Sequence, residues 1–265
     1  MPSASANGIT LYYELHGPEH APVLVLSNGI MMSTASWAYQ VQALSRHLRV
    51  LLYDCRGMWK SEHPPGPYSM KQHADDLAGL LETLGIEQAH IGGISYGAEI
   101  SMVFALEYPE KTQTLIVVDG VSQIDPLLYG QTFPWLAAAE KQDPELLFQT
   151  SYHMNFSEEW ITENKEFLEG SVERYAEIRM ESFAELMKAF YELDITGRLP
   201  EINSPTLIVV GEEDLIKGRK YSDILHKSIP NSEYVVVPGA GHALCLEKPG
   251  ELNSLLIGFA IKNSL

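Results

Sequence analysis

The chain has 265 residues, of which 45% are hydrophobic, 20% charged and 9% aromatic. At roughly 150 residues per domain, this length fits one large domain, or one domain with an insertion, that can bury a sizeable core without disulfides. The 18 basic and 35 acidic residues give a formal net charge of −17, and no segment concentrates the basic ones, so nucleic acid is excluded as an expected partner.

The cysteines and the first residues of the chain indicate in which cellular compartment the protein is expected. Cys55 and Cys245 lie far apart and form no CxxC motif, which predicts two buried free thiols. Residues 1–8 lack the basic and apolar regions of a secretory signal, and no stretch approaches the roughly 18 apolar residues that a membrane helix needs. We therefore expect a cytoplasmic protein with no membrane partner.

Short apolar runs alternate with longer helical patterns along most of the chain. In order, the pattern predicts an edge strand at 9–15, strands at 23–26 and 50–53, a helix between them at 36–47, a helix at 69–84, a strand at 89–94, a helix ending at Tyr108 before Pro109, and a strand at 115–118. After a break, strands at 206–210 and 234–237 alternate with helices at 221–229 and 249–261. Apolar strands separated by helices are typical of a mostly parallel sheet covered on both faces.

The alternation is interrupted at residues 122–198. This stretch has no strand pattern, is rich in Glu, Leu, Met and aromatic residues, and contains fifteen acidic and six basic residues. We interpret it as a helical cap inserted into one α/β core domain formed by residues 1–121 and 199–265.

The strongest motif is Gly93-Ile94-Ser95-Tyr96-Gly97, which stands where a predicted strand passes into a predicted helix. A sharp strand-to-helix turn exposes a serine hydroxyl, and flanking glycines permit the close crossing that such a turn requires. Ser95 is therefore the predicted nucleophile. A dinucleotide motif would need glycine where Ile94 stands, so that interpretation is disfavoured.

A nucleophilic serine needs a base and an acid that orients it. His242 follows the last predicted strand in a Gly-rich loop, at the carboxyl edge where Ser95 emerges, and is the predicted base; His153, in the cap, is a lesser candidate for substrate contact. Asp214 follows the strand at 206–210 and is the preferred acid, with Asp119 as the alternative. The order Ser95, Asp214, His242 is that of the α/β-hydrolase triad.

An acyl-transfer site also needs two donors for the developing oxyanion. The backbone N–H of Tyr96 lies at a predicted helix start, where partial positive charge favours an anion. The second donor is expected in the loop after strand 23–26, at the N–H of Ile30, with Met31 as the alternative one residue later.

With these residues identified, the chain resembles the α/β-hydrolase superfamily over nearly its whole length, and within it the 3-oxoadipate enol-lactonase-like and small carboxylesterase branch. The segments that carry the resemblance include 24–28, 53–57, 65–69 and 239–249. The resemblance implies the triad Ser95, Asp214 and His242 and the donors Ile30 and Tyr96. The chain departs from the usual pattern at Asn28, at Trp59 in place of a glycine, and at Glu99, whose position the sequence does not explain.

The cap is expected to determine specificity. Among its apolar residues we select Trp135, Met154 and Phe156, together with Met31 of the core, as the candidate substrate pocket. An apolar cap predicts an uncharged or weakly polar acyl substrate of modest size. No basic cluster indicates coenzyme A, and no His/Cys/Asp cluster has metal-ligand spacing, so neither cofactor nor metal is expected.

These residues predict a serine hydrolase that cleaves small carboxylic esters or lactones through an acyl-enzyme. Two alternatives stay open: the same fold used for C–C bond hydrolysis, hydroxynitrile cleavage or perhydrolysis, and a non-catalytic small-molecule receptor. The sequence does not determine the oligomeric state.

Overall fold

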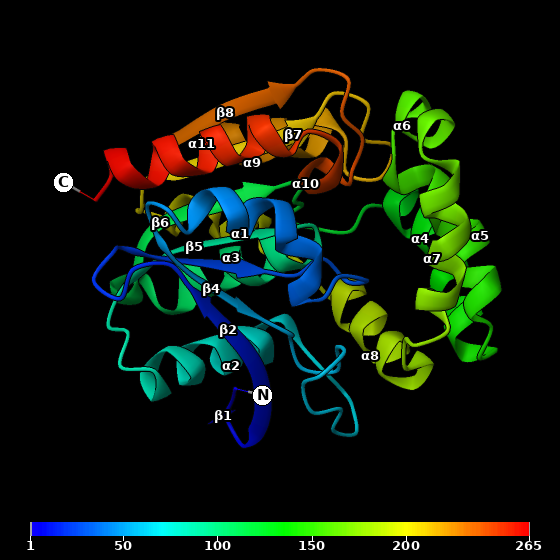
Figure 1. Cartoon of the computed structure of the whole chain (residues 1–265), viewed down its shortest axis with the longest axis horizontal. Helices are drawn as coiled ribbons and strands as arrows, with labels where there is room; N and C mark the ends of the chain where they lie inside the picture. Colours follow the sequence, from blue (N-terminus) through cyan, green and yellow to red (C-terminus); the bar gives the residue numbers. More distant parts are fainter. Residues whose placement is uncertain (1, 265) are drawn as a thin grey trace.

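A computed structural model describes residues 2–264, and its centre is an eight-stranded sheet (Figure 1). The sheet order is β1-β2-β4-β3-β5-β6-β7-β8; β1 and β2 run antiparallel to their neighbours, and all other pairs are parallel. The strands are β1 (Ser3–Ala6), β2 (Ile9–His16), β3 (Val23–Ser27), β4 (Arg49–Tyr53), β5 (Ala89–Ile94), β6 (Thr112–Val118), β7 (Thr206–Gly211) and β8 (Ser232–Val237).

The central strands are apolar throughout because both faces of the sheet are buried. Successive side chains of a strand point to opposite faces. In β3, Val25 belongs to one hydrophobic cluster, whereas Leu24 and Leu26 belong to the other. Two hydrophobic cores therefore lie on the two sides of one sheet. For this reason the strand sequences do not alternate between polar and apolar residues, as they would in a sheet with one exposed face.

Helices cover both faces. α2 (Met70–Thr83), α3 (Tyr96–Glu107) and α9 (Arg219–Ser228) contribute to the first cluster, and α1 (Ala38–Leu44), α10 (Leu244–Glu247) and α11 (Pro249–Lys262) contribute to the second. Short 3₁₀ turns occur at Thr34–Trp37, Pro109–Lys111 and Thr196–Glu201. No helix within residues 2–264 is long and apolar enough to cross a bilayer.

Five helices lie between β6 and β7: α4 (Pro126–Glu140), α5 (Pro144–Asn155), α6 (Glu158–Glu163), α7 (Lys165–Tyr175) and α8 (Met180–Tyr191). Figure 1 shows α4 to α7 together beyond the carboxyl ends of the parallel strands. An isolated antiparallel bridge joins Gln123 to Asp194, and the Ile195 N–H donates to the Ser122 carbonyl at 2.9 Å. The insertion therefore leaves and re-enters the core at one place.

The prediction that the strand beginning at Ile9 lies at the edge of the sheet is wrong. β1 pairs with β2 from Ser3↔Tyr12 to Ala6↔Ile9 and occupies the edge. β1 escaped detection because its sequence, Ser-Ala-Ser-Ala, alternates in burial but contains no large apolar side chain. The other predicted strands and helices of the core are present, with ends shifted by a few residues.

Candidate active site

Ser95 lies in the turn between β5 and α3, in a strained conformation with φ 55° and ψ −119°. A Cβ on Gly97 would collide with the Ser27 carbonyl of the neighbouring strand, and one on Gly93 would collide with the backbone of Gly97. Only glycine permits this crossing, which forces Ser95 into the left-handed region. The strain therefore holds the hydroxyl above the sheet edge.

His242 connects the Ser95 hydroxyl to a buried carboxylate. Its Nε2 lies 2.9 Å from Ser95 Oγ, and its Nδ1 lies 2.8 Å from Asp214 Oδ2. The other Asp214 oxygen accepts the backbone N–H groups of Ile216 and Lys217 at 2.8 and 2.9 Å. Burial raises the pKa of Asp214, but His242 and these N–H groups outweigh burial and hold it below its usual range. Asp214 therefore accepts hydrogen bonds as a carboxylate and orients the ring.

Asp119, the alternative acid, lies close to this pair but makes no hydrogen bond to His242. Its Oδ1 accepts the Gly211 N–H at 3.0 Å, and its Oδ2 is buried without a partner in the described chain. Burial and the neighbouring Asp214 charge raise the pKa of Asp119 well above its usual range. Burial and its neighbour therefore favour the protonated form of Asp119, whereas the contacts of Asp214 favour the carboxylate.

Ligand atoms of Asp119, Asp214 and His242 lie within 4.8 Å of one another, which raises the question of a metal. Tetrahedral zinc with bonds of about 2.0–2.2 Å keeps its ligands about 3.3 Å apart or more. The 2.8 Å separation of His242 Nδ1 and Asp214 Oδ2 is that of a direct hydrogen bond. The geometry of Asp119, Asp214 and His242 therefore fits direct hydrogen bonding better than metal coordination.

Two backbone N–H groups adjoin Ser95. Within residues 2–264, neither the Ile30 nor the Tyr96 N–H donates a hydrogen bond, and both residues line a small cavity next to Ser95. The Ile30 loop is braced from behind by Asn28, whose side chain donates to Asp54 Oδ1 at 3.2 Å and accepts from Trp37 Nε1 at 2.8 Å. Asn28 thus supports the loop that carries the predicted donor.

The loop that carries His242 is braced against the cap. Glu247 accepts the Gly241 N–H at 3.1 Å and the Ser157 N–H at 3.2 Å, and the Ala243 N–H donates to the Asn155 carbonyl at 2.7 Å. The position of the imidazole therefore depends on the cap as well as on the core.

Glu99, which the sequence left unexplained, forms a buried ion pair with Lys217 at 2.7 Å. Its other carboxylate oxygen accepts the Val121 N–H at 2.9 Å. Because the Lys217 backbone N–H binds Asp214, this pair links the helix behind Ser95 to the acid loop. Sequence reasoning missed Lys217, for which only the unexplained Glu99 gave a signal.

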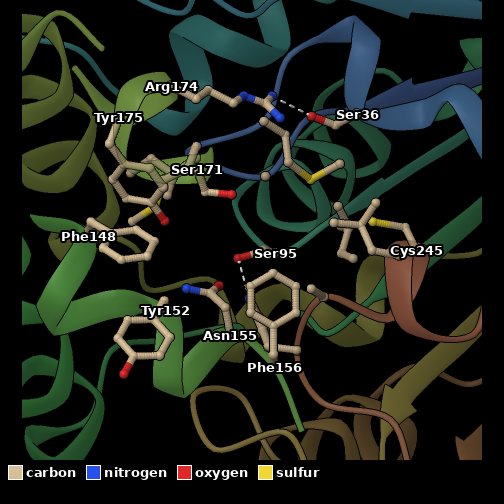
Figure 2. Close-up of a pocket in the computed structure, with 18 of the residues that line it drawn as sticks. Ser36, Ser95, Phe148, Tyr152, Asn155, Phe156, Ser171, Arg174, Tyr175 and Cys245 are labelled. Carbon is tan, nitrogen blue, oxygen red and sulfur yellow. Dashed lines mark hydrogen bonds between the residues drawn. The ribbon is translucent and has the colours of Figure 1, made fainter. Parts of the chain in front are cut away.

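A mainly apolar cavity of about 130 Å³ lies between the cap and Ser95 (Figure 2). Of the four residues selected from the sequence as a substrate pocket, Met31, Trp135 and Phe156 line this cavity, whereas Met154 does not and packs against the main core. At about 100° per residue, Phe148, Tyr152 and Asn155 share one face of α5, and Met154 points well away from it. The exposed His153 does not line the cavity either.

Both cysteines are free and buried, as predicted. Cys245 lines the cavity, and burial raises its thiol pKa to about 12, as it does for Cys55. At neutral pH such a thiol is protonated and therefore a weak nucleophile.

Residues 22–249 match the family model described as alpha/beta hydrolase fold. The chain belongs to the α/β-hydrolase family. It is 30% identical over 264 residues to a "putative carbamate hydrolase RutD" of Azorhizobium caulinodans, with 98% of each chain covered.

Two solved α/β-hydrolases illustrate the structural similarity. The enol-lactonase of Burkholderia xenovorans LB400 superposes with a TM-score of 0.91 at 28% identity, covering 97% of this chain and 99% of the other. A thermophilic esterase from Thermogutta terrifontis superposes with a TM-score of 0.92 at 26% identity over the whole of both chains. The resemblance to the enol-lactonase and small esterase branch is thereby confirmed.

Proposed function

We propose that this α/β-hydrolase is a serine hydrolase that cleaves carboxylic esters or lactones through an acyl-enzyme. The observation that carries the proposal is the continuous hydrogen-bonded chain Ser95–His242–Asp214, at 2.9 and 2.8 Å, beneath a mainly apolar cavity. Such a chain turns an unreactive alcohol into a nucleophile.

The steps follow from this geometry. The Ser95 hydroxyl donates its proton to His242 Nε2 as its oxygen attacks the carbonyl carbon. The oxyanion accepts hydrogen bonds from the Ile30 and Tyr96 N–H groups, and Asp214 stabilises the imidazolium through Nδ1. His242 then protonates the leaving alkoxide, and in the second half-reaction it takes a proton from the water that releases the acid.

The decisive experiment is Ser95→Ala with p-nitrophenyl acetate and butyrate. We expect kcat to fall by about 10⁴-fold or more, because the nucleophile is removed. Ser101→Ala is the matched control, since this buried hydroxyl on the same helix donates only to the Gly97 carbonyl. An organophosphate should label the wild-type chain at Ser95; full turnover by Ser95→Ala would contradict the proposal.

A second candidate is carbamate hydrolysis, which the name of the 30% identical relative suggests. Ser95 would attack a carbamate carbonyl in the same way, so the two reactions differ in the groups bonded to the carbonyl carbon and not in the residues used. Comparing kcat/KM on matched ester, lactone and carbamate substrates separates them, and a β-diketone and a cyanohydrin in the same panel test the other chemistries of this fold.

A further inference from the structure

Arg174 places a cation in a cavity for which the sequence predicted an apolar lining and an uncharged or weakly polar substrate. It projects from cap helix α7 and lines the cavity that contains Ser95. Figure 2 shows its guanidinium at one end of this cavity and the Ser95 hydroxyl near the centre. Sequence reasoning missed it because one arginine in a strongly acidic insertion resembles a surface charge.

The partners of Arg174 are neutral. One guanidinium nitrogen, Nη2, donates to Ser36 Oγ at 2.8 Å and to Ser33 Oγ at 3.3 Å. No carboxylate within residues 2–264 lies within ion-pair distance of it, and the charges of Glu177 and Asp54 act on the guanidinium only from further away. A guanidinium has five N–H donors, so most of its hydrogen-bonding capacity remains free.

The indole ring of Trp59 also contacts the Arg174 guanidinium. The Arg174 guanidinium carbon lies 5.0 Å from the centre of the indole ring, within the range of a cation–π contact. Trp59 has a φ of 42°, a left-handed conformation that costs a non-glycine residue roughly 1–2 kcal/mol. The fold therefore accepts backbone strain at the residue that positions this cation.

A second cavity of about 560 Å³ adjoins the first, and Trp59, Arg174, Ile30 and Ile178 line both. Its wall also carries Lys60, His63 and Arg179, with Glu177 as its only acidic residue among those described. In a chain of net charge −17, this is a locally basic region. An anion that approaches Arg174 meets an attractive field.

We propose that Arg174 is the subsite for a carboxylate carried by the substrate at the end remote from the reacting carbonyl. The guanidinium fork matches a planar carboxylate, which would give Arg174 a directly hydrogen-bonded anion in place of the two serine hydroxyls alone. The substrates are then half-esters of dicarboxylic acids rather than neutral esters. This inference rests on the proposed hydrolytic function.

The test compares monomethyl glutarate, an anion, with neutral methyl butyrate as substrates. We expect wild type to prefer the anionic ester, and Arg174→Met to lower the ratio of the two kcat/KM values by about 10- to 100-fold, the worth of a charge-assisted bidentate contact. Arg174→Lys, which keeps the charge without the fork, should lie between them. Arg198→Met, which removes a surface arginine paired with Glu107, should leave the ratio unchanged.

Two outcomes would overturn the proposal. If Arg174→Met slows both esters equally, Arg174 is a structural tie between α7 and the Ser33–Ser36 turn. If Arg179→Met changes the ratio and Arg174→Met does not, the anion binds in the second cavity.

Binding of glutarate to Ser95→Ala, measured by calorimetry, separates this inference from the hydrolytic proposal. Ser95→Ala should bind glutarate, and Ser95→Ala/Arg174→Met should bind it at least tenfold more weakly, whether or not the wild type hydrolyses esters. Equal affinity of the two variants would show that Arg174 binds no carboxylate.

Discussion

Glu99 and Lys217 form an ion pair of 2.7 Å in which the side chains are only 0% and 3% exposed. Glu99 stands one turn into the helix that follows Ser95, and Lys217 stands three residues after Asp214 in the acid loop. The pair therefore fixes the helix after Ser95 and the loop of Asp214 relative to one another. Separating the two segments would leave a buried charge without a partner, which is costly in the protein interior.

Removing one partner of this pair should be far more costly than removing both. Lys217→Met should lower the free energy of unfolding by about 3–5 kcal/mol, because it leaves Glu99 uncompensated, whereas Glu99→Gln/Lys217→Met should recover much of that loss. Urea unfolding measures both. Lys262→Met, which breaks the exposed pair with Glu233, is the control and should cost about 1 kcal/mol or less.

The Lys217→Met variant should also lose stability as pH rises. Burial raises the pKa of Glu99, and Lys217 opposes that rise. Without Lys217 the folded-state pKa rises further above the unfolded value, so stability is retained at low pH, where Glu99 is protonated, and is lost as pH rises through the folded-state pKa. A deficit relative to wild type that does not grow between pH 5 and pH 8 would contradict this account.

Asp214 and Asp119 should respond very differently to amide substitution. Asp214→Asn removes the negative charge that orients His242 and should lower kcat by about 10⁴-fold. Burial and Asp214 raise the pKa of Asp119, and its side chain makes no hydrogen bond to His242, so Asp119→Asn should keep kcat within about tenfold of wild type. Ester hydrolysis at pH 7 decides between the two acids, and a larger loss in Asp119→Asn would reverse their roles.

Asn28→Ala should impair the chemical step more than substrate binding. It removes the hydrogen bonds to Asp54 and Trp37 that brace the Ile30 loop. Displacing one oxyanion donor costs about 10²- to 10³-fold in kcat, and we expect a loss up to that size with KM changed by less than about threefold. Steady-state kinetics checks this; a change confined to KM would mean that the loop shapes the pocket only.

His90 should make the fold sensitive to acid. Burial lowers its pKa to about 4, and its ring nitrogens bind the hydroxyls of Thr114 and Ser264 at 2.9 Å. Between pH 6.5 and 4 the unfolded chain binds a proton that the folded chain does not, so His90 lowers stability as pH falls, by up to about 1.4 kcal/mol per pH unit. Urea unfolding of His90→Gln should show a shallower dependence on pH, whereas exposed His20→Gln should match wild type.

Much of the core was predictable because its signals are local. Buried parallel strands appear as continuous apolar runs, and the turn at Ser95 requires glycines at fixed spacing, so the sheet and the positions of Ser95, Asp214 and His242 follow from the sequence. The three residues follow β5, β7 and β8, and the structure brings them within hydrogen-bond distance at the carboxyl edge of the sheet. Only the order of the strands in the sheet determines this result.

What escaped prediction depends on contacts between distant segments. Lys217 pairs with a residue 118 positions away, and Arg174 meets Ser33 and Ser36 across 141 and 138 positions. Nothing near either basic residue in the sequence indicates such partners. The prediction for Met154 was wrong for a different reason. Met154 was selected because it is apolar, but the orientation of α5 about its own axis determines which of its side chains face the cavity.

The bridge between Gln123 and Asp194 has a consequence for engineering. The five-helix segment leaves and re-enters the core at this bridge. A change in its length or sequence therefore need not shift the pairing of β6 with β7. A segment from another hydrolase, spliced at these two points, could exchange substrate preference as a cassette. The transplant would also need new partners for the contacts that tie the native segment to the core, among them those of Glu247 and Arg174.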